Sequence, residues 1–219
     1  MKWLLTLTML ATLASHAWAD TVTLDVPAGA KLQWNEAQAR IGKTRLYQPE
    51  EKSDECESEN SRQLKSAVGP VVSFMAVGNG YCKGAAHPWA SQSFEAYDSR
   101  TGKLLPITAL FDEATVLTAL KQDKLVRKAL AGQNVTSLKE LAEKANGECE
   151  FTLYGIGTSY AFHHIKDGKV AVRFGLSHGC EAMRGNFTQL GVYLPIPPQL
   201  KPWLDSAEKR GLLMNKLDK

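Results

Sequence analysis

The residues of this chain that could carry chemistry are its four cysteines and its histidines. Structural zinc sites usually combine closely spaced cysteine pairs, whereas these cysteines lie 26, 67 and 31 residues apart. An even number of cysteines in a chain with an export signal is typical of disulfides. We therefore expect two disulfides, and a zinc site is the alternative. The cysteines are Cys56, Cys82, Cys149 and Cys180.

The cysteine pairing follows from a predicted β-hairpin. Asp167-Gly168 is a strong signal for a tight turn between two strands. Cys149 precedes the first of these strands and Cys180 follows the second, so antiparallel pairing returns both to one end of the sheet. We predict Cys149–Cys180, which leaves Cys56–Cys82 on either side of a strand that begins at residue 71.

Two adjacent histidines, His163 and His164, raise the question of a metal site. Neighbouring residues of a strand point to opposite faces, so we expect one packed and one exposed histidine rather than a shared ion. A metal site would need His87 or His178 alongside them. The sequence predicts no cofactor, no metal and no catalytic residue.

The segment of residues 80–89 is the best candidate for ligand recognition. It combines small residues, which allow close backbone approach, with Tyr81, His87 and Trp89. Loops between strands often carry binding residues because the sheet fixes their position. We predict that these three residues bind a ligand; the alternative is that they cover the end of the sheet.

The first 19 residues are typical of a signal peptide. Lys2 precedes an apolar run over residues 3–13, and Ala17 and Ala19 have the small side chains that a signal peptidase requires. Cleavage is expected after Ala19. No later segment is long enough to span a membrane. We therefore predict a periplasmic or secreted protein without a transmembrane segment.

The order of expected elements predicts an α+β fold, in which an antiparallel sheet packs with two or three helices. Helices are expected over residues 112–130, from Ser137 to about 146, and over 200–213. Residues 20–69 are interpreted as an N-terminal strand and an acidic loop, the latter over residues 48–66, which pack on a main domain of residues 70–219.

Composition excludes two further classes of protein. The chain is 44% hydrophobic, which is too high for a disordered protein. Its net charge of +3 leaves no strong electrostatic footprint for nucleic acid. A globular protein that binds no nucleic acid remains.

Four short motifs resemble a family of exported domains of unknown function. These domains occur in the extracytoplasmic part of the lysozyme-sensing anti-sigma-V factor and beside peptidoglycan deacetylase domains. The resemblance covers about residues 70–200, with a weaker match after residue 160. The motifs are Val72-Ser73-Phe74, Tyr81-Cys82-x-Gly84-Ala85-Ala86-His87-Pro88, Tyr97-Asp98-x-x-Thr101-Gly102-Lys103 and Leu110-Phe111.

The resemblance implies a noncatalytic binding domain of the cell envelope. Its partner would be an envelope protein or glycan, such as a muramidase or a peptidoglycan-related ligand. The alternative is an envelope hydrolase that uses carboxylates or a histidine-bound metal. Paired carboxylates would have to lie at a set separation, which a sequence does not reveal.

Overall fold

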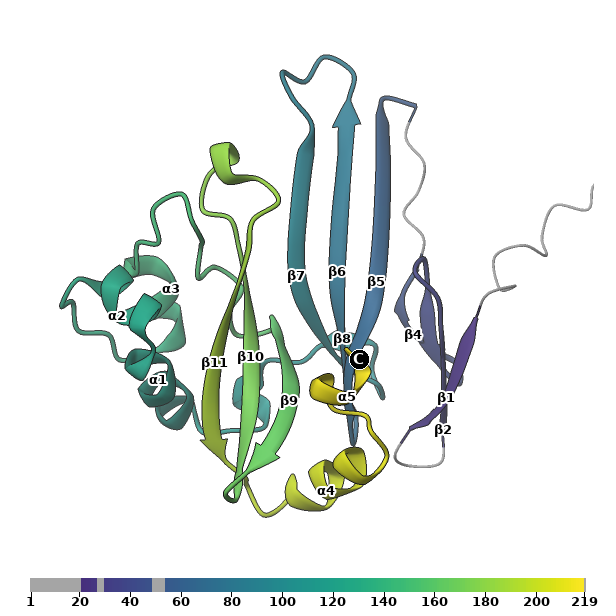
Figure 1. The fold of residues 1–219 in the computed structure, drawn as a ribbon. Coiled ribbons are helices and arrows are strands. Elements are labelled where there is room, and N and C mark those ends of the chain that lie inside the picture. Colours follow the sequence, from purple (N-terminus) through teal and green to yellow (C-terminus); the bar gives the residue numbers. More distant parts are fainter. Residues whose placement is uncertain (1–20, 27–29, 49–53, 219) are drawn as a thin grey trace, which may run out of the picture.

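The computed structural model describes residues 21–26, 30–48 and 54–218. The predicted signal peptide lies outside the described residues. The fold is α+β, as predicted, with antiparallel strands in three sheets and two disulfides (Figure 1). Among the described helices, none has the length and apolar character needed to cross a bilayer.

The central sheet contains β5 (Cys56–Val68), β6 (Val71–Cys82), β7 (Trp89–Asp98) and β8 (Lys103–Leu104) in sequence order. The turn between β5 and β6 contains Gly69, whose φ of 55° favours glycine. A Cβ atom at Gly69 would lie 2.3 Å from the Trp203 ring, so the close approach of this ring also requires glycine.

The acidic segment expected to be a loop is a strand from Cys56 onward, so that prediction was wrong. Its acidic and polar side chains are mostly exposed, while its backbone pairs with β6 along its whole length. Strand pairing satisfies the backbone whatever the side chains are, and tertiary context overrides propensity. The domain boundary predicted at residue 69 falls in the turn between these paired strands.

A four-stranded N-terminal sheet packs on one face of the central sheet. Its strands are β1 (Val22–Val26), β2 (Ala30–Trp34), β3 (Ala39–Ile41) and β4 (Thr44–Tyr47). The ring of Tyr47 meets those of Phe74 and Tyr97 at centroid distances of 5.0 and 6.5 Å. These aromatic contacts join the two sheets into one core.

The third sheet lies on the other side of the central sheet (Figure 1) and has the strand order β11-β10-β9. Its strands are β9 (Tyr160–Lys166), β10 (Lys169–Ser177) and β11 (Phe187–Pro195). Asp167 and Gly168 both have positive φ, at 49° and 70°, which confirms the predicted hairpin. Phe187 contacts Phe94 of β7 edge-to-face at 5.3 Å.

The helices gather at the outer side of the third sheet and at the lower end of the molecule (Figure 1). The helix expected over residues 112–130 is divided at Asp123, whose extended backbone ends one helix while its carboxylate caps the next. Ser137 caps a further helix, as predicted. The helices are α1 (Glu113–Gln122), α2 (Lys124–Leu130), α3 (Leu138–Lys144), α4 (Lys201–Lys209) and α5 (Met214–Leu217), with short 3-10 turns at Ile107–Ala109 and Glu181–Met183.

Both predicted disulfides are confirmed. Cys56 and Cys82 are direct partners in the β5–β6 register and are joined with a Cα–Cα distance of 3.9 Å. The Cys149–Cys180 bond links the segment before β9 to the segment after β10. The described residues contain no free cysteine.

A β-bulge in β5 connects the central sheet to the rest of the molecule. The register with β6 shifts between Leu64 and Ser66, so Lys65 is the extra residue. Its side chain is buried, and its Nζ donates to Gln63 Oε1 at 2.8 Å and to Asp218 Oδ1 at 2.7 Å. Ser66 Oγ accepts a hydrogen bond from the Phe162 N–H of β9.

The buried ammonium group leads to a stability prediction. Asp218→Ala removes a charged partner from Lys65 and is expected to lower the free energy of unfolding by about 1–3 kcal/mol. Lys65→Met in the same background should recover much of this loss, because it removes the buried charge itself. Urea denaturation measures both effects.

Asp205→Ala is the matched control, because Asp205 pairs with Lys201 on an exposed helix surface. This change should cost less than about 1 kcal/mol. Equal losses for Asp218→Ala and Asp205→Ala would show that the buried ion pair has no special role.

Candidate binding groove

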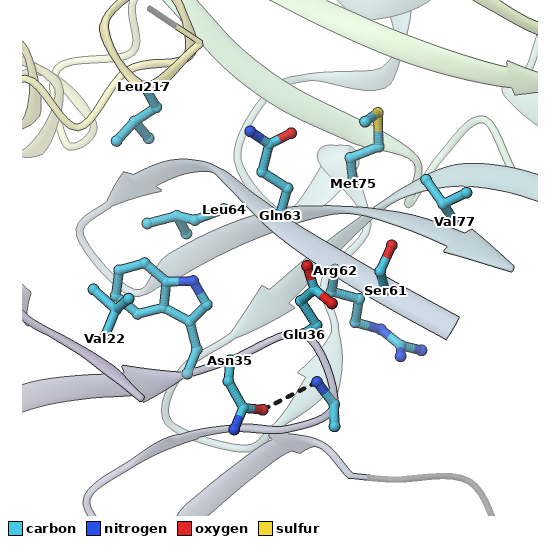
Figure 2. A pocket seen from close by; sticks show the side chains of 12 residues that line it. Val22, Asn35, Glu36, Ser61, Arg62, Gln63, Leu64, Met75, Val77 and Leu217 are labelled. Carbon is cyan, nitrogen blue, oxygen red and sulfur yellow. Dashed lines mark hydrogen bonds between the residues drawn. The ribbon is translucent and has the colours of Figure 1, made fainter. Parts of the chain in front are cut away.

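A groove of about 950 Å³ runs along β5, between the ends of β1 and β2 on one side and α5 on the other (Figure 2). Its apolar lining comes from widely separated parts of the chain. These residues are Val22, Trp34, Leu64, Met75, Val77 and Leu217. The groove is therefore created by packing of the central sheet against the N-terminal sheet and the C-terminal segment.

Four consecutive residues of β5, Ser61 to Leu64, line the groove. Because successive side chains of a strand point to opposite faces, a lining by consecutive residues means that the strand's edge faces the groove. Figure 2 shows Gln63 and Met75 on one side of this strand and Arg62 on the side of Asn35. The groove thus wraps around an edge of the central sheet.

The polar part of the groove rests on an ion pair between β5 and β7. Arg62 Nε donates to Glu95 Oε2 at 2.9 Å, and the Tyr97 hydroxyl donates to the same oxygen at 2.7 Å. The guanidinium of Arg62 also lies over the Tyr47 ring, 4.7 Å from its centroid. Both charges are therefore held by the scaffold beneath the groove.

Two tyrosine hydroxyls keep their protons in this network. Burial raises the pKa of Tyr97 well above its usual range, and the negative charge of Glu95 adds to the effect. Burial likewise raises the pKa of Tyr47. The Tyr47 hydroxyl donates to the Asn35 carbonyl at 2.6 Å, which positions the loop after β2. The loop residues Asn35 and Glu36 are thereby fixed at the groove wall.

The structure does not bring the three predicted ligand-binding residues into one cluster. Trp89 is the register partner of Gly80, so Tyr81, the next residue, points to the opposite face of the sheet. The Trp89 ring covers Gly78 and Gly80, and a Cβ atom at Gly80 would lie 2.9 Å from its Nε1. His87 Nδ1 lies 3.2 Å from Glu181 Oε1. None of the three predicted residues lines the groove.

The two adjacent histidines lie on the same face, so the prediction of opposite faces was wrong. The β9–β10 register shifts at this point, pairing Phe162 with Val172 and His164 with Ala171. His163 is the extra residue of the bulge, and bulges change the direction of side chains. His163 Nδ1 consequently lies 2.6 Å from His164 Nδ1.

The histidine pair has a mixed electrostatic environment. His164 Nε2 lies 3.0 Å from the Tyr193 hydroxyl. Burial lowers the pKa of His163, and the nearby charges of Arg173 and His164 lower it further, whereas Asp218 opposes the shift. In the part of the chain that the structure describes, no three His, Cys, Asp or Glu side chains converge as metal ligands.

The groove was not predicted from the sequence, although one signal for β5 was present. Cys56 and Cys82 are equally distant from the Gly69-Pro70 turn signal. A disulfide between them is compatible with two strands that pair around this turn, which would have identified β5. No comparable signal connects Trp34 or Leu217 to β5, because they are far apart in the sequence.

No protein-family model, curated protein or solved structure matches this chain. The functional interpretation therefore depends on the groove and its surroundings.

The packing of Trp89 on two glycines leads to a second prediction. Trp89→Ala uncovers the backbone at Gly78 and Gly80 and should lower the free energy of unfolding by about 1–3 kcal/mol. His87→Ala should change it by less than about 0.5 kcal/mol, because His87 is exposed. Tyr154→Ala provides an aromatic control, since Tyr154 is 87% exposed. If all three variants unfold at the same urea concentration, Trp89 is not structural.

The lowered pKa of His163 predicts a pH dependence of stability. The unfolded chain binds a proton near pH 6.5, whereas folded His163 binds it only at lower pH. The free energy of unfolding should therefore fall as the pH decreases from 7 toward the folded-state pKa. His163→Gln should reduce this dependence in urea titrations at pH 7.5 and 5.5.

His87→Gln serves as the control for this experiment, because His87 lies on the surface. An unchanged pH dependence in His163→Gln would contradict the assignment to His163.

Proposed function

We propose that this chain is an exported, noncatalytic binding protein of the cell envelope and that its ligand occupies the groove along β5. The observation that carries the proposal is the groove itself. It is large, open along its length and combines an apolar wall with fixed polar groups. Ligand-binding sites commonly have this mixture, in which apolar contacts give affinity and a few polar groups fix orientation.

Export is supported by two observations. The chain forms two disulfides, which persist in oxidising compartments. Its first 19 residues have the sequence pattern of a signal peptide, with cleavage proposed after Ala19. Together these features favour the periplasm or the extracellular space.

A binding role is supported by the state of the charged groups beneath the groove. The Glu95 carboxylate accepts hydrogen bonds from Arg62 and Tyr97. A carboxylate engaged in this way is suited to holding the shape of the site. The ligand is proposed to be an envelope protein or glycan, which agrees with the muramidase or peptidoglycan-related ligands implied by the family resemblance.

Groove variants test this proposal. Ser61→Tyr places an aromatic ring in the groove, and Trp34→Ala removes part of its wall. Both should reduce capture of the ligand from an envelope extract by about tenfold or more, as expected for a contact at the centre of an interface. Immobilised mature protein is the bait, and bound material is quantified by mass spectrometry.

Ser58→Tyr is the matched control, because Ser58 is an exposed residue of the same strand that does not line the groove. It should capture ligand like the wild type. Thermal melting of every variant confirms folding. Normal capture by folded Ser61→Tyr would exclude the groove, and release of soluble fragments from peptidoglycan would favour the hydrolase alternative.

A further inference from the structure

β5 has one strand neighbour in the described part of the chain. The sheet order is β5-β6-β7-β8, so β6 pairs with one edge of β5 and the other edge faces the groove. Along an edge strand, alternate residues direct their backbone N–H and C=O groups away from the sheet. Such an edge can pair with an extended segment of another chain.

We propose that the groove binds an extended, basic polypeptide segment, which adds to the outer edge of β5 as a further antiparallel or parallel strand. This inference rests on the proposed function, since it names the kind of ligand that the groove takes. The ligand's main chain would pair with residues 61–64, and its side chains would enter the two sides of the groove alternately.

The bulge at Lys65 sets the end of the accessible edge. Beyond the bulge, the Ala67 N–H donates to the Leu212 carbonyl, so the C-terminal segment already pairs with this part of β5. Before the bulge, Ser61 to Leu64 line the groove. An added strand would therefore pair with β5 between Cys56 and Leu64.

The two sides of the groove offer apolar contacts for alternate side chains of an added strand. On one side lie Met75 and Val77, the register partners of Gln63 and Ser61, together with Leu217. On the other side lie Trp34 and Val22 (Figure 2 shows Val22). A ligand with apolar residues at alternate positions would fill both sides, as side-chain specificity in strand addition requires.

The charges around the edge favour a basic ligand. Glu57 and Glu59 are exposed residues of β5, and Glu36 lies on the opposite wall of the groove. None of these three carboxylates forms an ion pair with another described residue, whereas Arg62 is neutralised by Glu95. Lysine or arginine side chains of an added strand would compensate the acidic edge.

A synthetic peptide tests this mode of binding directly. The probe is a fluorescent peptide of alternating valine and lysine, about nine residues long, which matches the length of a typical strand. We expect saturable binding to the full mature protein by fluorescence anisotropy. Methylation of the four central backbone nitrogens should abolish binding, because it removes donors and blocks both edges of the peptide.

Charge and position are tested by separate variants. Glu57→Gln with Glu59→Gln should weaken binding of the lysine peptide by about two- to tenfold and reduce its salt dependence. Glu143→Gln with Glu150→Gln, two exposed positions outside the groove, is the matched control and should leave binding unchanged. A peptide with glutamate in place of lysine should bind more weakly to the wild type.

Hydrogen exchange provides a readout that does not depend on a variant. Bound peptide should slow the exchange of alternate amides of β5 before the bulge. Equal binding of the methylated peptide, or protection confined to other strands, would overturn strand addition. So would preferential binding of soluble muropeptides in the groove.

The two proposals fail in different ways. If Ser61→Tyr captures the envelope ligand normally, the groove is not the ligand site and the proposed function fails. If Ser61→Tyr loses capture while the methylated and parent peptides bind equally, the groove remains the ligand site and only strand addition is overturned.

Discussion

The ammonium group of Lys65 lies almost entirely out of water, where β5, β9 and the C-terminal segment meet. Removing a charge from water is costly unless the charge is paired and hydrogen-bonded. Gln63 and Asp218 provide the partners, and Asp218 comes from the other end of the chain. The C-terminal segment must therefore close over β5 before the bulge is satisfied, which also places Leu217 beside the groove.

Two bulges lie where the central and third sheets meet, and each redirects a polar side chain. In β5 the bulge turns Lys65 toward the C-terminus, and the next residue, Ser66, binds the backbone of Phe162 in β9. In β9 the bulge follows Phe162 directly and brings His163 to the side of His164. Irregular pairing thus joins the sheets through hydrogen bonds while the inner faces of their strands stay apolar.

The groove depends on the same arrangement. Its floor is rigid because Arg62 and Glu95 neutralise each other on neighbouring faces of β5 and β7, and Tyr47 packs against the guanidinium from the N-terminal sheet. The Cys56–Cys82 disulfide holds the far end of β5 in register with β6. An edge that is fixed at both ends loses little conformational entropy when a ligand pairs with it.

The sequence by itself determined the local features: the Asp167-Gly168 hairpin, the Asp112 and Ser137 helix caps, the α+β class and both disulfides. These depend on turn residues, caps and short-range periodicity. Tertiary structure alone decided that acidic residues 56–62 form a strand, that His163 and His164 share a face, and that Trp34 and Leu217 line one groove. Strand pairing and bulges are set by partners distant in the chain, because the backbone forms the same ladder under many side-chain patterns.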